Sequence, residues 1–448
     1  MPSFPSQLRL TGGDYFLYSL DHGMRRVGMF GSNCRIVLRL AGKPDTVRLK
    51  QCLAASPIFD WLSRTRLTRS FPIFAPRWRT GVRSAALFQE HVCNGVSRDS
   101  VAGLPPAILV RSLRADRSPA LALDLVCHAD GAADLALSWD HTLLVVHGAE
   151  LLLRHLHDEG SPTTASRLPE SHNPEQAELG LPRLWRGYWR RLLFARNSLG
   201  LIYSVCHEPL FSMLPGTKPK SSCRNHYRIL TLTETEGARA EAHCQRLNAG
   251  FRRSLFHLAA TIQAVHGLAV SRGKATGAYL VPVPHNLRRP GANGPILSNQ
   301  LSFLFYRIEP EMAGNMSATI AEMTRQMADQ IRNQCPASFL AAMEMFKIMP
   351  PGFYTYRLGR PTGGKFAAFF FSDSGETCAG MNELFGAPIA AVTHLAPASR
   401  PPGLTVIFSR FRQRHSATVA WVDDCLRAEE AEDLAQRLRS ALLGEEVP

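Results

Sequence analysis

Alternation of apolar and polar positions predicts a series of β-strands along the chain. Residues 35–40 (RIVLRL) repeat with a period of two, as a strand at a sheet surface does. Residues 119–128 (PALALDLVCH) and 132–138 (AADLALS) form a predicted pair, and Asp130-Gly131 between them favours a hairpin. Further strands are predicted at residues 277–283, 300–308, 366–371, 404–411 and 417–422.

Apolar positions three and four residues apart predict helices between these strands. Asp45 is a suitable N-cap for a helix that extends to residue 55, and residues 148–157 have a second helical pattern. Longer helices are predicted at residues 184–205, 247–268, 316–335 and 429–443. Helices interspersed with strands in both halves indicate an α/β or α+β fold, with mixed sheets flanked by helices.

The segment at residues 161–180 (SPTTASRLPESHNPEQAELG) is polar and carries three prolines, so it is the best candidate for a linker. It divides the chain into an N-terminal range, 1–180, and a C-terminal range, 181–448. A length of 448 residues suits two or three domains, and a hydrophobic content of 45% is ordinary for globular proteins.

Several classes of protein are disfavoured by the composition. No uncharged apolar run reaches the roughly 18 residues of a membrane span, and the first residues contain no stretch of signal-peptide type. The ten cysteines are scattered without a C-x-x-C pair, which argues against the usual zinc and redox signatures. These features predict a cytoplasmic protein.

The chain has a formal net charge of +14, and its first hundred residues hold 15 basic and 6 acidic residues. A basic surface attracts polyanions such as nucleic acid, anionic lipid or the phosphates of coenzyme A. Because no nucleic-acid-binding motif accompanies the charge, we do not expect a nucleic-acid partner. A nucleic-acid binder remains a rival hypothesis that rests on charge alone.

His141 is the first candidate for catalysis. It lies between the predicted strand that ends at Ser138 and the predicted helix that begins near Gly148. An imidazole at a rigid strand end can project into a cleft and serve as a general base. It can take a proton from an alcohol or amine while that group attacks an acyl carbonyl. The alternative is a histidine that only bonds neighbouring backbone.

The surrounding residues, 135–153 (LALSWDHTLLVVHGAELLL), resemble the H-H-x-x-x-D-G motif of the condensation-like acyltransferase superfamily. That superfamily includes chloramphenicol acetyltransferase, the condensation domains of peptide synthetases, and the bacterial wax ester synthase/diacylglycerol acyltransferases. In register, Asp140 takes the first His position and His141 the second, which is the family's general base. Val145 and Val146 replace the Asp-Gly pair.

Other stretches are similar to the wax ester synthase group, and they occur in the expected order. They are residues 10–17 (LTGGDYFL), 247–248 (LN), 284–289 (PHNLRR), 298–303 (SNQLSF), 371–375 (FSDSG) and 401–404 (PPGL). The resemblance implies two similar subdomains that meet along a channel faced by the catalytic histidine. Asn299 and Ser302 are candidates for polar groups near that channel, where they could stabilise an oxyanion. Strand-end capping and sheet packing are the alternative roles for both.

The valine in the motif's Asp position leaves four alternatives open. The loop can be repacked around an intact base, because apolar packing can replace a buried ion pair at little cost. Asp140 can instead orient His141 or a substrate. His147, six residues after His141, can have taken over as the base. Finally, catalysis can be lost, which would leave a protein that binds a carrier protein, a thioester or a lipid.

The resemblance therefore implies an acyltransferase of lipid or secondary metabolism. It would move an acyl group from a coenzyme A or acyl-carrier-protein thioester to a hydroxyl or amine acceptor, without a metal or redox cofactor. Aromatic residues and arginines at 184–205 suit a lipid interface, so peripheral contact with the inner face of the membrane is one expectation. A crossover helix with its aromatic side chains packed on a subdomain is the other.

Overall fold

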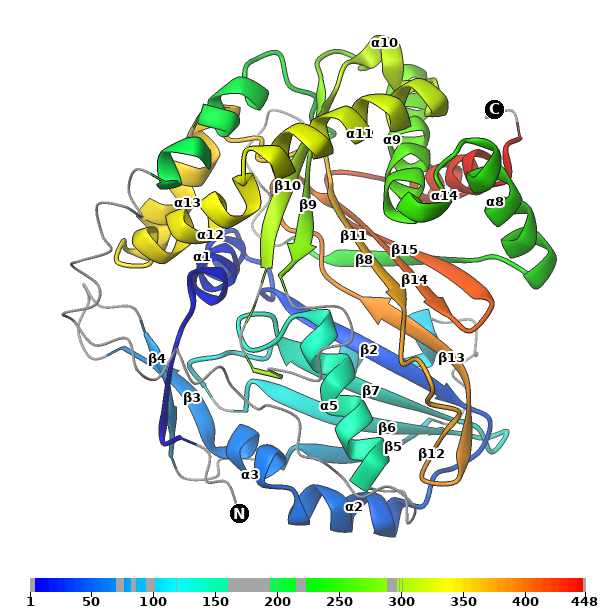
Figure 1. Ribbon diagram of the computed structural model, residues 1–448. Helices are drawn as coiled ribbons and strands as arrows, with labels where there is room; N and C mark the ends of the chain where they lie inside the picture. Colours follow the sequence, from blue (N-terminus) through cyan, green and yellow to red (C-terminus); the bar gives the residue numbers. More distant parts are fainter. Residues whose placement is uncertain are drawn as a thin grey trace.

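The computed structural model describes residues 5–69, 76–81, 86–93, 101–117, 119–159, 194–198, 200–214, 223–287, 296–297, 299 and 301–445. Two large sheets organise these residues, one in the lower and one in the upper part of Figure 1. The lower sheet has six strands in the order β12-β13-β2-β7-β6-β5, and only β5 and β6 run parallel. Its strands are β2 (Asn33–Leu40), β5 (Phe88–Cys93), β6 (Leu121–His128), β7 (Ala133–Asp140), β12 (Glu383–Leu384) and β13 (Ala387–Leu395).

The upper sheet has four strands in the order β11-β14-β15-β8, with β11 parallel to β14. An antiparallel pair, β9 and β10, and a small three-stranded sheet, β1-β4-β3, complete the strands of the described residues. The bounds are β1 (Gln7–Arg9), β3 (Thr65–Thr68), β4 (Arg77–Thr80), β8 (Asn225–Thr231), β9 (Tyr279–Asn286), β10 (Leu301–Ile308), β11 (Phe370–Glu376), β14 (Leu404–Phe411) and β15 (Arg414–Val422).

Helices cover both sheets. They are α1 (Gly12–Arg26), α2 (Thr46–Ala55), α3 (Pro57–Arg64), α4 (Pro106–Leu109), α5 (Val146–Glu159), α8 (Glu234–Arg246), α9 (Arg253–Ser271), α10 (Pro310–Ala313), α11 (Met316–Arg332), α12 (Cys335–Phe346), α13 (Pro351–Gly359) and α14 (Ala428–Leu443). Short 3-10 turns occupy Val101–Gly103, Gly250–Arg252 and Arg360–Thr362. Mixed sheets flanked by helices in both halves confirm the predicted fold class.

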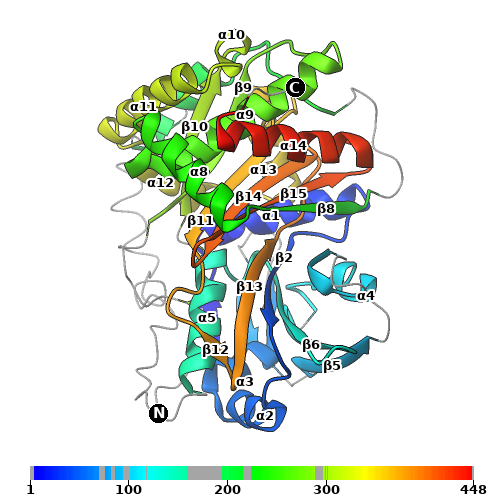
Figure 2. The same ribbon diagram turned by 90° about the vertical axis from the view of Figure 1, so that its right-hand side faces the viewer.

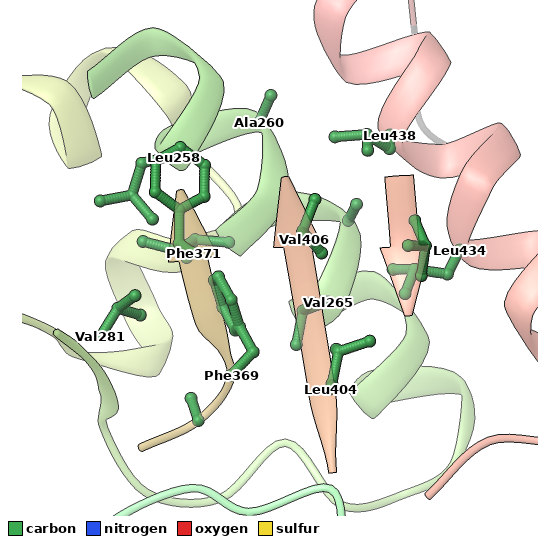
Figure 3. Packing of buried hydrophobic residues seen from close by; sticks show 14 of the residues in the cluster. Leu258, Ala260, Val265, Val281, Phe369, Phe371, Leu404, Val406, Leu434 and Leu438 are labelled. Carbon is green, nitrogen blue, oxygen red and sulfur yellow. The ribbon is translucent and has the colours of Figure 1, made fainter. Parts of the chain in front are cut away.

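The core of the upper half packs α9 and α14 against the four-stranded sheet. Figure 3 shows Leu258 of α9 beside Phe371 of β11, and Val265 of α9 beside Leu404 of β14, with Leu434 of α14 on the other side. All five are at most 2% exposed, and each such side chain stabilises the fold by roughly 1.5–3 kcal/mol. This packing fixes β11 and β14, which both contribute to the cavity described below.

Most predicted elements occur close to their expected bounds. The alternating segments at residues 35–40, 119–138 and 404–411 are β2, the β6–β7 hairpin and β14. Asp45 caps α2 by accepting a hydrogen bond from the Arg48 amide at 3.0 Å. The expected helices at 148–157 and 429–443 are α5 and α14. Periodicity therefore located these elements correctly.

The helix predicted at residues 247–268 is wrong at its start. Leu247 is the C-cap of α8, and Asn248 has φ +55°, so the chain turns here before α9 begins at Arg253. Helix α8 itself was missed, although its capping box, Thr233 with Glu236, is a recognisable signal. The strand expected at residues 366–371 begins only at Phe370, because Phe366 adopts φ +63°.

The two halves exchange elements across the predicted boundary at residue 180, which itself lies outside the described residues. Strand β13, from the C-terminal range, pairs with β2 in the lower sheet, as Figure 2 shows. Helix α1, from the N-terminal range, packs on α12 and α13 of the upper half. Sequence order alone does not reveal either exchange.

One helical stretch, Gly250–Ser271, is long and apolar enough to cross a membrane by length and composition. In this structure it includes α9, whose side chains pack against α11 and α14. Of the segment at residues 184–205, with its possible lipid-facing aromatics, residues 184–193 lie outside the described residues. Residues 194–198 and 200–205 are helical, as expected.

Candidate functional site

A cavity of about 290 Å³ lies between the two halves. The lower half contributes α1, β2, the loop after β7 and the first turns of α5 to its wall. The upper half contributes β9, β10, β11 and β14. Because elements from both halves form the wall, a ligand in this cavity would touch both.

His141 lines this cavity and is half-buried. Its backbone amide donates to the Ser32 carbonyl at 2.9 Å, which ties the residue to the start of β2. Its Nδ1 lies 2.9 Å from the Leu144 carbonyl oxygen. A carbonyl can only accept, so Nδ1 carries the proton and Nε2 has the free lone pair. Nε2 has no hydrogen-bond partner among the described residues.

Burial lowers the pKa of His141 below its ordinary value, and the hydrogen bond to Leu144 opposes that shift only partly. The imidazole is therefore neutral at pH 7. A neutral imidazole with an unoccupied Nε2 is the protonation state that a general base requires.

Asp140 is buried and its carboxylate turns toward the loop backbone. Its oxygens accept hydrogen bonds from the amides of Ala115 at 3.0 Å and Thr142 at 2.9 Å. An Arg25 nitrogen lies 4.0 Å away. Burial and the nearby Asp21 raise the pKa of Asp140 to about 7. These contacts give Asp140 a part in shaping the loop, and no contact joins its carboxylate to the His141 ring among the described residues.

Asn299 connects three distant parts of the chain. Its side-chain amide donates to the Asp14 carboxylate at 2.7 Å and to the carbonyls of Thr142 at 3.0 Å and His141 at 3.3 Å. Its backbone amide also donates to Asp14, at 2.6 Å. Gly13 sits so close that an added Cβ would lie 2.5 Å from the Asn299 carbonyl oxygen. Asn299 thus holds the His141 loop from behind, and it is not among the residues of the cavity wall.

The other two predicted site residues lie in different surroundings. Ser302 is fully buried and donates to the Pro336 carbonyl at 2.6 Å, so it anchors the start of α12 to β10. Its hydroxyl therefore bonds to α12, and Ser302 is not among the residues of the cavity wall, where the sequence suggested a role for it. His147 is half-buried on α5 and lines the cavity, as His141 does.

A second group of polar side chains, which the sequence did not single out, lies in and next to the cavity wall. Glu150, on α5, lines the wall, and its Oε1 lies 3.6 Å from Nε2 of His394 on β13. The His394 Nδ1 is 3.1 Å from the Ser374 hydroxyl of β11. Glu150 follows Val146 by four residues, so helical spacing from the motif could have placed it on the cavity face. His394 could not be found, because β13 joins the lower sheet from the far end of the sequence.

Burial raises the pKa of Glu150 to about 8, partly offset by Arg154, and burial lowers the pKa of His394 to about 4. Between pH 4.5 and 8 the folded protein keeps a proton on Glu150 that the unfolded chain has released. Stability from this group is therefore complete at low pH and is lost as the pH rises toward 8.

We accordingly expect the Glu150→Gln variant to gain stability relative to the parent as the pH rises. The difference in free energy of unfolding should widen by up to about 1.4 kcal/mol per pH unit between pH 5 and 8, because glutamine does not titrate. Urea unfolding of both proteins at pH 5, 6.5 and 8 measures this difference. A difference that stays constant over that range would show that Glu150 titrates normally.

Comparison with known proteins supports the architecture. No family model matches the sequence, and no curated protein matches it. Solved structures do match over the full length. The trichothecene 15-O-acetyltransferase TRI3 from Fusarium sporotrichioides has 13% identity and a TM-score of 0.69, covering 98% of this chain and 95% of that one. The first condensation domain of the calcium-dependent antibiotic synthetase, in complex with a substrate analogue, has 13% identity and a TM-score of 0.68, covering 98% and 97%.

A third match is the SgcC5 protein from Streptomyces globisporus, with 15% identity, a TM-score of 0.67, and coverage of 98% of this chain and 100% of that one. At these identities the likeness establishes the fold. The chain therefore has the two-part fold of condensation domains and acetyltransferases, which the sequence motifs predicted. The finer likeness to the wax ester synthase group stays a prediction.

Proposed function

We propose that this protein transfers an acyl group from a thioester to a hydroxyl or amine acceptor, with His141 as the general base. The observation that carries the proposal is the arrangement of one imidazole. Its Nδ1 proton is held by the Leu144 carbonyl, its Nε2 is unoccupied, and the ring lines a cavity shared by both halves. The fold shared with known acyltransferases supports the same reaction class.

The chemistry requires two substrates and one proton carrier. The Nε2 of His141 takes the proton from the acceptor hydroxyl or amine as that group attacks the thioester carbonyl. The resulting tetrahedral intermediate collapses, the carbon–sulfur bond breaks, and the thiolate leaves. The imidazolium then gives its proton to the thiolate, so the base is regenerated. No covalent acyl-enzyme is needed, because both substrates meet in one cavity.

The donor would place its acyl chain along the wall formed by α1 and β10, where Phe16, Leu20 and Phe303 line the cavity. A second hollow of about 660 Å³ adjoins it and shares Leu20. Arg26 and Arg360 line that hollow, are exposed, and have no acidic partner in the described part of the chain. Two free guanidinium groups suit the phosphate of a pantetheine arm. We propose this hollow as the donor entrance, for coenzyme A or an acyl carrier protein.

Purified protein tests the proposal directly. Acetyl, octanoyl and palmitoyl groups would be offered on coenzyme A and on a phosphopantetheinylated carrier protein, each with a panel of alcohols and amines. We expect thiol release that requires an acceptor, together with an ester or amide detected by mass spectrometry in equal amount. Thiol release that yields only the free acid, whether or not an acceptor is present, would reject acyl transfer.

The rival is a protein that binds a thioester, a carrier or a lipid without turnover. It is favoured by Val145, which stands in the motif's Asp position and lines the cavity. It predicts saturable binding of acyl coenzyme A or acyl carrier protein with no product.

A cytoplasmic location and peripheral membrane contact through residues 184–205 are further parts of the proposal. Cell fractionation would test both, by showing whether the protein is found in the soluble or in the membrane fraction.

A further inference from the structure

Several polar residues of the cavity wall come from α5 and β11. Glu150 comes from α5, and Ser372, Asp373 and Ser374 come from consecutive positions of β11. The wall contributed by α1 is apolar, and that of β9 and β10 is mainly so. Figure 1 shows α5 and β11 on adjacent sides of the boundary between the halves. A ligand that fills the whole cavity would therefore contact apolar side chains of α1 and hydrogen-bonding groups of α5 and β11.

Glu150 lies next to two side chains from other elements, His394 of β13 and Ser374 of β11. The Ser374 hydroxyl lies 3.1 Å from Nδ1 of His394, and Nε2 of His394 lies 3.6 Å from Oε1 of Glu150. The last distance is too long for a hydrogen bond. Both of those atoms are buried and have no hydrogen-bond partner among the described residues. The side chain of Glu150 is 14% exposed, whereas that of His394 is 2% exposed.

Unpaired buried polar atoms are costly, so their retention needs an explanation. An unsatisfied buried donor or acceptor costs about 1–3 kcal/mol. Two apolar side chains would fill the same space without that cost. The pair therefore favours a function for the carboxyl group that lines the cavity, such as recognition of a polar group on a ligand.

The protonation state of the pair selects the chemistry of that ligand group. Burial keeps Glu150 protonated and His394 neutral at pH 7, and Arg154 is the cation that opposes the shift on Glu150. A neutral acid offers one donor and one acceptor, and a hydroxyl group matches both. An ammonium group would lack an acceptor, and a carboxylate would lack a donor while adding a buried charge.

We infer that Glu150 of the cavity wall, with His394 beside it, binds a second hydroxyl group of the acceptor substrate. The acceptor is then an alcohol or amine with an additional hydroxyl several carbon atoms away from the reacting group. Four helical residues separate Val146, beside the motif, from Glu150, which corresponds to about 6 Å along α5. The inference rests on the proposed acyl transfer, because that reaction defines which substrate is the acceptor. Hydroxyl binding at Glu150 can be measured without catalysis.

Calorimetric binding to the full chain tests this inference, with paired ligands of equal length. The pairs are 1,6-hexanediol with 1-hexanol and 1,8-octanediol with 1-octanol. We expect the parent to bind a diol at least about tenfold more tightly than its mono-alcohol. The mono-alcohol lacks the second hydroxyl, so it would leave the Glu150 carboxyl group unpaired. Glu150→Leu should remove this preference, whereas Glu150→Gln should keep most of it, since an amide also donates and accepts.

A matched control is Glu322→Leu, which removes a glutamate from the surface of α11, outside the cavity wall. It should bind the diols like the parent, and circular dichroism would confirm that each variant is folded. Equal affinity of the parent for diol and mono-alcohol, or an unchanged preference in Glu150→Leu, would overturn the inference. Diol preference without thioester turnover would instead reject the proposed function and leave hydroxyl binding at Glu150 standing.

Discussion

Replacement of His141 by alanine is expected to lower kcat for acyl transfer by about 10²–10⁴-fold, the usual contribution of a general base. The reason is geometric, because Nε2 is the unoccupied proton acceptor of a ring fixed by the Leu144 carbonyl. Binding of the donor should change little, so KM for the thioester should stay near the parent value. Steady-state kinetics with both substrates measures kcat and KM separately.

The matched control for this substitution is His157→Ala, which removes a histidine from the far end of the same helix, α5. It should leave kcat unchanged. His147→Ala provides the decisive comparison, since His147 lines the same cavity. Loss of activity in His147→Ala together with its survival in His141→Ala would transfer the role of base to His147.

The acid side of the pH–rate profile adds an independent check on the same base. Burial lowers the pKa of His141 below 6.5, so the imidazole stays unprotonated through the neutral range. The midpoint of the acid limb should therefore lie below pH 6.5, the ordinary value for histidine, as the imidazole gains a proton. A fall that begins above pH 7 would contradict a buried, neutral His141.

Local periodicity was sufficient to predict the fold class, because the strands and helices that carry it have strong patterns. β14 was predicted at its observed bounds, and α5 and α14 within two residues at each end. The errors arose where the backbone conformation of a single residue decides whether a helix or strand continues. Asn248 and Phe366 adopt positive φ, so the chain turns at positions where hydrophobic pattern alone continues an element.

Only part of the candidate site has a signal in the sequence, because its support comes from contacts between distant residues. A short motif identified His141, and the same motif comparison placed Asp14 and Asn299 among its separate segments. The sequence could not show that these two residues, 285 positions apart, bond to each other and to the His141 loop. It also gave Asn299 a possible place at the oxyanion, whereas its amide protons are used to hold the loop. Such contacts follow from packing of the two halves and leave no local pattern.

Removal of the Asp14–Asn299 contact is expected to lower the free energy of unfolding more than most single substitutions do. Asp14→Ala would take the acceptor away from the Asn299 backbone amide, the Asn299 side chain and the Thr11 amide. Because these donors lie in or near the interior, we expect a loss of about 3–5 kcal/mol in the free energy of unfolding. Urea unfolding at pH 7.5 is the measurement, above the pKa of about 6 to which burial raises Asp14.

Asp45→Ala is the matched control, since Asp45 also accepts from an amide at a helix start, but at an exposed site and with one partner, Arg48. An ordinary N-cap of this kind is worth about 1 kcal/mol. The difference between the two variants isolates what Asp14 does beyond capping α1, which is to hold Asn299 and, through it, the carbonyls of His141 and Thr142. Kcat should consequently fall in Asp14→Ala and not in Asp45→Ala. Equal losses of stability in the two variants would mean that the His141 loop is held by its own half alone, with Asn299 as a passive neighbour.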